Sequence, residues 1–249
     1  QSGQLKFVQG GFVTGGELNG AKYEVEDGAE MRMVDDLNED IAIETCSADV
    51  TLRGSGSLFA SLDSLRTVGA NGKIRLESGR VFTTMQAVQN NGLISVGQTA
   101  RFEFTPDAGS TSFNNGLIEA AQGGTVVVKN GAALTNMGVV KADGGLVVFE
   151  TGADLGNVNA ATLVGGQFIA QGGGVIRSDQ LANVTRFNSD VIVRGSASDL
   201  RDGLGNSVLP NLTAVGPLGS LLLDGRNVVL ANNLTVEGNS SSRGHITVA

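Results

Sequence analysis

Residues 114–140 read NNGLIEAAQGGTVVVKNGAALTNMGVV, and this stretch contains the unit that decides the fold. It opens on Asn-Asn-Gly before a short apolar segment and ends on Asn-Met-Gly before another. We call the position of these glycines, Gly116 and Gly138, the glycine slot, and the distance between them is the length of one unit. The same slot recurs along the chain at Gly72 and Gly92, and Asn159 extends the series. A regular period of ~22 residues predicts structural units that stack on one another.

Each unit contains a second and a third strand-like segment. Two glycines precede an apolar run at 123–128, at 144–149 and again at 165–170. A short segment then closes the unit, at 132–135 and at 153–156. One unit therefore holds about three short strands. Glycine and asparagine at the corners are expected to supply the positive φ angles that sharp corners demand.

Corner residues that recur at one long period indicate stacked coils rather than a sandwich or a barrel. In a stack, each coil lies in the same surroundings as the one before it, so the same residue types are needed at each corner. We predict an all-β chain folded as a β-solenoid, with about three short strands per coil of ~22 residues. About 11 such coils at roughly 4.8 Å each would span on the order of 50 Å.

An asparagine slot precedes the glycine slot and supports this interpretation. The aligned positions are Ala70, Asn90, Asn114, Asn136 and Asn157. Stacked asparagine side chains can hydrogen-bond along the axis as a ladder. The alternative is that Asn-Gly marks ordinary hairpin turns.

The regularity is uneven along the chain. Residues 1–66 are predicted to be an acidic, irregular capping region continuous with the solenoid, and residues 67–249 its body, with an irregular insertion around 177–210. The window 17–49 holds 11 acidic and two basic residues, whereas residues 50–249 are neutral. A neutral body with no basic stripe argues against nucleic acid, and the acidic end argues against anionic membranes. No apolar run reaches the length of a membrane span.

Residues able to perform chemistry are scarce. His245 is the only histidine and Cys46 the only cysteine, which disfavours a Ser-His-Asp triad, a zinc site or a thiol enzyme. We assign no catalytic or cofactor-binding residue. Calcium is the one ion to consider, because Asp36, Asn38 and Asp40 have the oxygen-ligand spacing that begins a calcium loop. Ile41 and Ser47 stand where an EF-hand needs Gly and Glu, so the alternatives are a looser calcium site or a solvated acidic turn.

Paired carboxylates for glycoside chemistry are a second possibility. Asp35-Asp36 and Gly244-His245 are similar to fragments of β-helical pectin-degrading enzymes, but they lie near opposite ends of the chain. Two catalytic carboxylates must flank one bond. With no Trp and one Tyr, the chain also lacks the usual platforms for sugar stacking.

The units quoted above resemble the degenerate β-helix repeats of bacterial secreted surface proteins, including autotransporter passengers and filamentous-haemagglutinin-like adhesins. The resemblance covers residues 70–176 well and 205–249 weakly. It implies a right-handed parallel β-helix exposed outside the cell.

We therefore expect a secreted or cell-surface protein, its signal peptide already removed, with a non-enzymatic structural or adhesive role. Its partners would be surface glycans, proteins of a host or neighbouring cell, or further copies of itself in filaments or a matrix layer. The alternative outcomes are a monomeric rod with covered ends, and a polysaccharide-binding or polysaccharide-processing β-helix of the lyase or tailspike kind.

Overall fold

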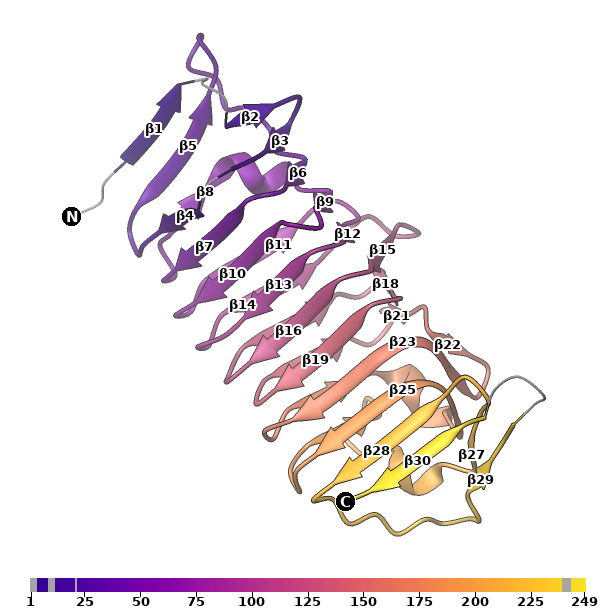
Figure 1. Ribbon diagram of the computed structural model, residues 1–249. Helices are drawn as coiled ribbons and strands as arrows, with labels where there is room; N and C mark the ends of the chain where they lie inside the picture. The colour runs from indigo at the N-terminus through magenta and orange to yellow at the C-terminus, as the bar shows by residue number, and fades with distance from the viewer. Residues whose placement is uncertain (1–3, 9–11, 21, 239–242) are drawn as a thin grey trace.

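A computed structural model describes residues 4–8, 12–20, 22–238 and 243–249 of the chain. The chain is all-β, with 50% of its residues in strands and 6% in short helical turns, and it winds into a parallel β-solenoid of about nine turns. Figure 1 shows the strands stacked as rungs from the N-terminal end to the C-terminal end. No helix among the described residues is long and apolar enough to cross a bilayer.

One long sheet runs the whole length of the stack and contains the strand that follows each slot glycine. Its strands, in order of pairing, are β4 (Lys22–Val25), β7 (Asp49–Arg53), β10 (Lys73–Glu77), β13 (Leu93–Val96), β16 (Leu117–Ala121), β19 (Val139–Asp143), β23 (Thr162–Gln171) and β25 (Arg186–Arg194). Beyond β25 the sheet divides into two short branches, β27 (Ala214–Val215) with β29 (Thr235–Val236), and β28 (Ser220–Asp224) with β30 (His245–Val248).

Two further sheets complete the coils. The second sheet contains β11 (Val81–Thr84), β14 (Arg101–Phe104), β17 (Thr125–Val128), β20 (Leu146–Phe149), β24 (Val175–Arg177) and β26 (Asp199–Arg201). The third contains β2 (Val13–Thr14), β3 (Glu17–Leu18), β6 (Thr45–Cys46), β9 (Thr67–Val68), β12 (Gln89–Asn90), β15 (Thr111–Asn114), β18 (Ala133–Asn136) and β21 (Asp154–Leu155).

Smaller elements finish the two ends. At the N-terminal end, β1 (Gln4–Val8), β5 (Glu30–Val34) and β8 (Leu58–Phe59) form a three-stranded sheet. Three 3-10 helices, η1 (Ala60–Ser64), η2 (Asp179–Asn183) and η3 (Leu209–Asn211), lie in connections between strands. The hairpin strand β22 (Val158–Asn159) pairs antiparallel with β23.

Coil length varies more than the repeat suggests. Lys73 pairs with Leu93 and Asp190 pairs with Ser220, so the second of these coils is longer than the first by half. The expectation of about 11 coils was therefore wrong, and about nine turns use the same chain. Extra residues enter at the corners, where loops and 3-10 turns lengthen a coil without disturbing its neighbours.

The predicted series of slots was wrong in its last member. The residue of β23 that pairs with Val139 is Gln167, so Gly166 rather than Asn159 continues the glycine slot. Asn159 lies in the hairpin strand β22, opposite Thr162. That hairpin is an insertion into the coil, and its Asn159 falls at the distance from Gly138 that the repeat predicts.

The Gly-Gly series was wrong in the same place. Val175 follows Leu146 in the second sheet, so Gly173-Gly174 succeeds Gly144-Gly145, and Gly165-Gly166 belongs to the other corner. In the asparagine slot, Val68 rather than Ala70 lies beside Asn90.

Glycine serves two different purposes at the corners. Slot glycines such as Gly116 have ordinary φ angles, but a Cβ there would lie 2.1 Å from the carbonyl oxygen of Gly92 in the coil below. Close stacking of backbone therefore demands glycine at this slot, and at Gly166 a φ of +61° adds to that demand. In the Gly-Gly pair both reasons apply, because Gly144 has φ +70° and a Cβ on Gly145 would lie 2.5 Å from the carbonyl oxygen of Ala120.

The core is one continuous column inside the three sheets. The sequence offers Val126, Val128, Val147, Phe149, Leu117 and Val139 as candidates for this column, and the first four are buried. In the long sheet, Ile118 and Val140 point inward while the candidates Leu117 and Val139 are half-buried on the outer side. Val127 and Val148 are also buried, so alternation alone could not assign the phase of these all-apolar strands.

The two regions with a weak sequence repeat are built into the same stack. The N-terminal β4 pairs in register with β7, and β7 pairs in register with β10, so much of the region 1–66 forms coils. Residues 177–210 contain β25 and β26, both in parallel register with the coil before them. Their coils are longer because η2 and η3 connect their strands, and the longer connections hide the repeat in the sequence.

Candidate functional site

The asparagine ladder runs through the interior at one corner. Asn90 Nδ2 donates to Asn114 Oδ1 at 2.7 Å, and Asn114 Nδ2 donates to Asn136 Oδ1 at 2.7 Å. Asn157 continues the stack differently, since its Oδ1 accepts the backbone N–H of Asn136 at 2.6 Å. All four are buried, and each Nδ2 also donates to a backbone carbonyl of the adjacent corner. The ladder fastens successive coils and is a structural device.

Charged side chains form a second set of ladders on the outer faces. On the second sheet, Lys129 lies 2.9 Å from Glu150 and 3.7 Å from Glu103, which Arg101 also contacts at 2.5 Å. Burial acts to raise the pKa of the Glu103 carboxyl, but the Arg101 hydrogen bond and the nearby cations outweigh it and hold this pKa below its usual value. These cross-strand pairs join neighbouring coils from outside.

The long sheet has a comparable cluster. Lys141 Nζ lies 2.9 Å from Glu119 on the preceding strand and 2.8 Å from Asp143 on its own strand. The hydrogen bond from Lys141 lowers the pKa of Asp143. Although burial acts to lower the pKa of Lys141, its two acidic neighbours raise it overall. A lysine held between two acids in this way is fixed in its charged state.

The calcium candidates Asp36, Asn38 and Asp40 all lie in the turn after β5. Asp40 Oδ1 accepts from Arg32 Nε at 2.7 Å, and the neighbouring Asp35 accepts the backbone N–H groups of Leu37 and Glu39, both at 2.9 Å. Asn38 occupies the turn with φ 65°. Across the described part of the chain, no three His, Cys, Asp or Glu side chains are grouped as metal ligands would be. In this turn, Arg32 and backbone N–H groups are hydrogen-bond donors to the Asp40 and Asp35 carboxylates.

The remaining candidates lie far apart. Asp35 and Asp36 follow β5 near the N-terminal end, whereas His245 begins β30 at the C-terminal end (Figure 1), so the stack separates them. His245 Nε2 lies 2.8 Å from Thr247 Oγ1. Cys46 is buried within β6, and desolvation raises the pKa of its thiol to about 11. Such a thiol is un-ionised at neutral pH.

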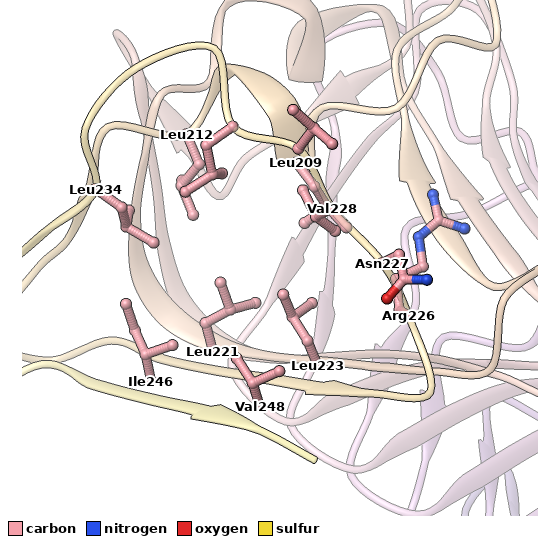
Figure 2. Close-up of a pocket in the computed structure, with 12 residues that line it drawn as sticks. Leu209, Leu212, Leu221, Leu223, Arg226, Asn227, Val228, Leu234, Ile246 and Val248 are labelled. Carbon is pink, nitrogen blue, oxygen red and sulfur yellow. The ribbon is translucent and has the colours of Figure 1, made fainter.

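Sequence reasoning missed an apolar cavity at the C-terminal end of the stack. It has a volume of about 440 Å³ and is lined chiefly by leucine, isoleucine and valine side chains. Figure 2 shows Leu221, Leu223, Ile246 and Val248 on one side of it, facing Leu209, Leu212 and Val228 across the cavity. Among the lining residues, Leu209, Leu212 and Leu221 are buried, whereas Val229 and Val248 are exposed.

A polar cluster holds the rim of this cavity together. Arg226 donates to the almost fully buried Asp199 at 2.8 Å and to the Ser196 carbonyl at 2.6 Å. Asp199 also accepts from Ser207 at 2.9 Å. The cluster ties the segment after β28 back to β26, which positions the apolar residues 228–230 over the cavity.

A shallower groove lies on the long sheet, beside the bulge in β23. It measures about 570 Å³ and combines the exposed Met137 and Leu218 with Gln167, Asn188 and Asp190. The β22 hairpin and the bulge between Val164 and Gln167 open it, because they break the regular stacking at this corner.

The chain matches no protein-family model, no curated protein and no solved structure in comparisons with known proteins. The geometry of this molecule is therefore the only basis for a functional assignment.

Proposed function

We propose that the protein is a structural or adhesive element of a cell surface or extracellular matrix, and that its working part is the stiff solenoid itself. The observation that supports this proposal is the uninterrupted linkage between coils. Core packing runs along the whole stack, and at its centre the asparagine ladder and outer ion pairs also join neighbouring coils. Stability in such a stack accumulates through interfaces between neighbours, which suits an element that must keep its shape and present its sides.

Adhesion would use the outer faces of the rod, with surface glycans or proteins of another cell as partners. The test is retention of protein-coated beads on glycan arrays and on cell layers, compared with beads coated with a chemically unfolded sample. We expect retention that requires the folded rod. Equal retention by both samples would overturn the adhesive role.

The groove beside the β23 bulge favours a second candidate, a polysaccharide-binding or polysaccharide-processing β-helix. Pockets of this size with convergent polar groups and an apolar wall suit small ligands, and Asn188, Asp190 and Gln167 supply amide and carboxylate groups for sugar hydroxyls. Incubation with a panel of polysaccharides separates the candidates. The structural role predicts no new reducing ends or unsaturated products. Turnover lost on Asp35→Asn, Asp36→Asn or Asp190→Asn would favour the second candidate.

A further inference from the structure

The groove beside the β23 bulge is a notch in one corner of the rod, and two glycines form part of its floor. Gly166 continues the glycine slot of Gly138, so by register Gly165 stands where the preceding coil has Met137. In the bulge, Gly165 and Gly166 have φ angles of +64° and +61°. Met137 and Leu218 come from coils before and after the bulge, and they are 60% and 70% exposed. The notch therefore has an open floor between two apolar walls.

Two polar side chains of β25 line this groove, and one atom of each is already fixed. Asn188 and Asp190 lie on the outer face of the strand, with the buried Ser189 between them. Asn188 Oδ1 accepts the backbone N–H of Leu218 at 2.9 Å, and Asp190 Oδ1 accepts from Ser220 Oγ at 2.7 Å. Within the described part of the chain, no group bonds to Asn188 Nδ2 or to Asp190 Oδ2. The groove thus offers one positioned donor and one positioned acceptor.

The charge of the groove is negative. Asp190 lines it, and no lysine or arginine is found among its described lining residues. Two cations on the strands that flank β23 are held by acids instead, since Lys141 lies 2.9 Å from Glu119 and Arg186 lies 2.5 Å from Glu237. An anionic ligand would bring a second negative charge beside the Asp190 carboxylate, which is unfavourable. The groove therefore selects against uronic acids and sulfated sugars.

An acetamido group fits this combination of donor, acceptor and apolar wall. Asn188 and Asp190 are two residues apart on one strand, which separates them by about 6.6 Å at the usual rise. The N–H and C=O of a planar trans amide point in opposite directions, so one such group can lie between the two side chains. Its carbonyl would accept from Asn188 Nδ2, and its N–H would donate to Asp190 Oδ2. Leu218, which is anchored to Asn188, supplies apolar surface for the methyl group.

We propose that this groove binds an uncharged glycan through an N-acetylated amino sugar. Gln167 lies opposite Asp190 in the register of β23 and β25, so its amide serves the ring hydroxyls of the same sugar. A polypeptide also carries amides, but extended peptides bind by adding to an open sheet edge, and this groove lies over strands that are paired on both sides. The inference rests on the polysaccharide-binding candidate and names the sugar that its groove would take.

The test is saturation-transfer NMR and calorimetry on the intact chain, with the linear N-acetylglucosamine trimer and methyl N-acetylgalactosaminide as probes. We expect the strongest transfer at the acetyl methyl protons. Binding of the N-acetylglucosamine trimer should be about tenfold or more tighter than that of the matched glucose trimer, which lacks the acetamido hydrogen bonds. No binding of either acetamido sugar at millimolar concentration would overturn the proposal. Equal or tighter binding of the glucose trimer, a galacturonic acid trimer or an N-acetylated alanine tripeptide would do so as well.

Two nearly isosteric variants test the site itself. Asn188→Asp keeps an oxygen for the Leu218 N–H and removes the free donor, whereas Asp190→Asn keeps an oxygen for Ser220 and removes the free charged acceptor. Each should weaken binding of the N-acetylglucosamine trimer by about tenfold or more. Leu218→Ser removes an exposed wall at little cost to stability and should reduce transfer to the acetyl methyl protons. Unchanged affinity in both Asn188→Asp and Asp190→Asn would overturn the assignment of the groove.

A matched control separates the groove from overall charge. Asp224→Asn removes the same charge from an exposed residue of the long sheet that does not line the groove, and it should bind like the unchanged chain. Thermal melts check that every variant is folded. Equal loss of binding in Asp224→Asn and Asp190→Asn would overturn the proposal.

The inference and the proposed function fail separately. If beads coated with Asn188→Asp or Asp190→Asn were retained on acetamido glycans as well as the unchanged chain, the adhesive role would stand and this inference would be overturned. If the N-acetylglucosamine trimer bound in solution but no beads were retained, the adhesive role would be overturned and this inference would stand. Binding of the glucose trimer alone would keep the polysaccharide-binding candidate and overturn the preference for an acetamido sugar.

Discussion

Removing one member of the asparagine ladder should be far more damaging than removing the asparagine next to it. Asn114 is fully buried, donates to Asn136 Oδ1 and to the Val139 carbonyl at 2.7 and 2.9 Å, and accepts from Asn90 at 2.7 Å. Asn114→Ala deletes all three hydrogen bonds and leaves their buried partners without one of their contacts. At about 1 kcal/mol per bond, and about 1–3 kcal/mol for an unsatisfied buried group, we expect a loss of ~3–5 kcal/mol in the free energy of unfolding.

Asn115→Ala is the matched control. Asn115 is exposed and donates to Asn91 Oδ1 at 2.8 Å, so its removal should change the free energy of unfolding by less than about 0.5 kcal/mol. Urea unfolding followed by circular dichroism measures both variants. Since a stack of repeats can unfold in parts, amide exchange in β15 and β18 should be measured as well. If Asn114→Ala and Asn115→Ala lost equal stability, the ladder would not hold the coils together.

Three further predictions test other parts of the molecule. Gly116→Ala should lower the free energy of unfolding by about 3 kcal/mol, because its Cβ would lie 2.1 Å from a carbonyl oxygen. Gly97→Ala is the control and should be tolerated, because Gly97 has an ordinary φ and the nearest atom to its Cβ would lie 3.8 Å away. Thermal melts compare the two variants. The pKa of Glu103 is depressed in the folded chain, so its contribution to stability is present above its unfolded pKa and is lost as pH falls through the folded value. Glu103→Gln should therefore flatten the stability profile on the acid side, measured by urea unfolding at successive pH values. Iodoacetamide should modify Cys46 only as fast as the chain opens, because burial raises its pKa to about 11; fast labelling of the native protein would contradict this.

The stacked centre of the molecule could be predicted because its coils differ little in length. From β10 to β19 the register passes from Lys73 to Leu93, Leu117 and Val139 in nearly equal steps, so the same residue types return to the same corner and are visible in the sequence. The slot asparagines Asn90, Asn114 and Asn136 follow from this regularity. The reason for the slot glycines did not follow, since close approach of backbone and positive φ select the same residue type.

Prediction failed where insertions entered the coils. The hairpin that contains Asn159 mimics a slot at the expected spacing, and only pairing of β19 with Gln167 reveals the displacement. The end cavity could not be found either, because Leu221, Ile246 and Val248 read as ordinary core positions. A repeat pattern marks the inward positions of a coil, and it does not record where the packing between them leaves a cavity. The groove beside the bulge has the same origin, since Asn188 and Asp190 are brought near Met137 by a corner insertion.

The most direct test of the stacked rod is a distance between two spin labels attached by Lys73→Cys and Asp190→Cys. Both positions are exposed on the long sheet, and Cys46 is too buried to be labelled. Register connects them through five inter-strand steps, from β10 through β13, β16, β19 and β23 to β25. At roughly 4.8 Å per step, the two Cα atoms should lie about 24 Å apart, with a narrow distribution of label distances around that value. A broad distribution, or a mean that differs by more than the reach of the labels, would contradict a single stiff stack of coils.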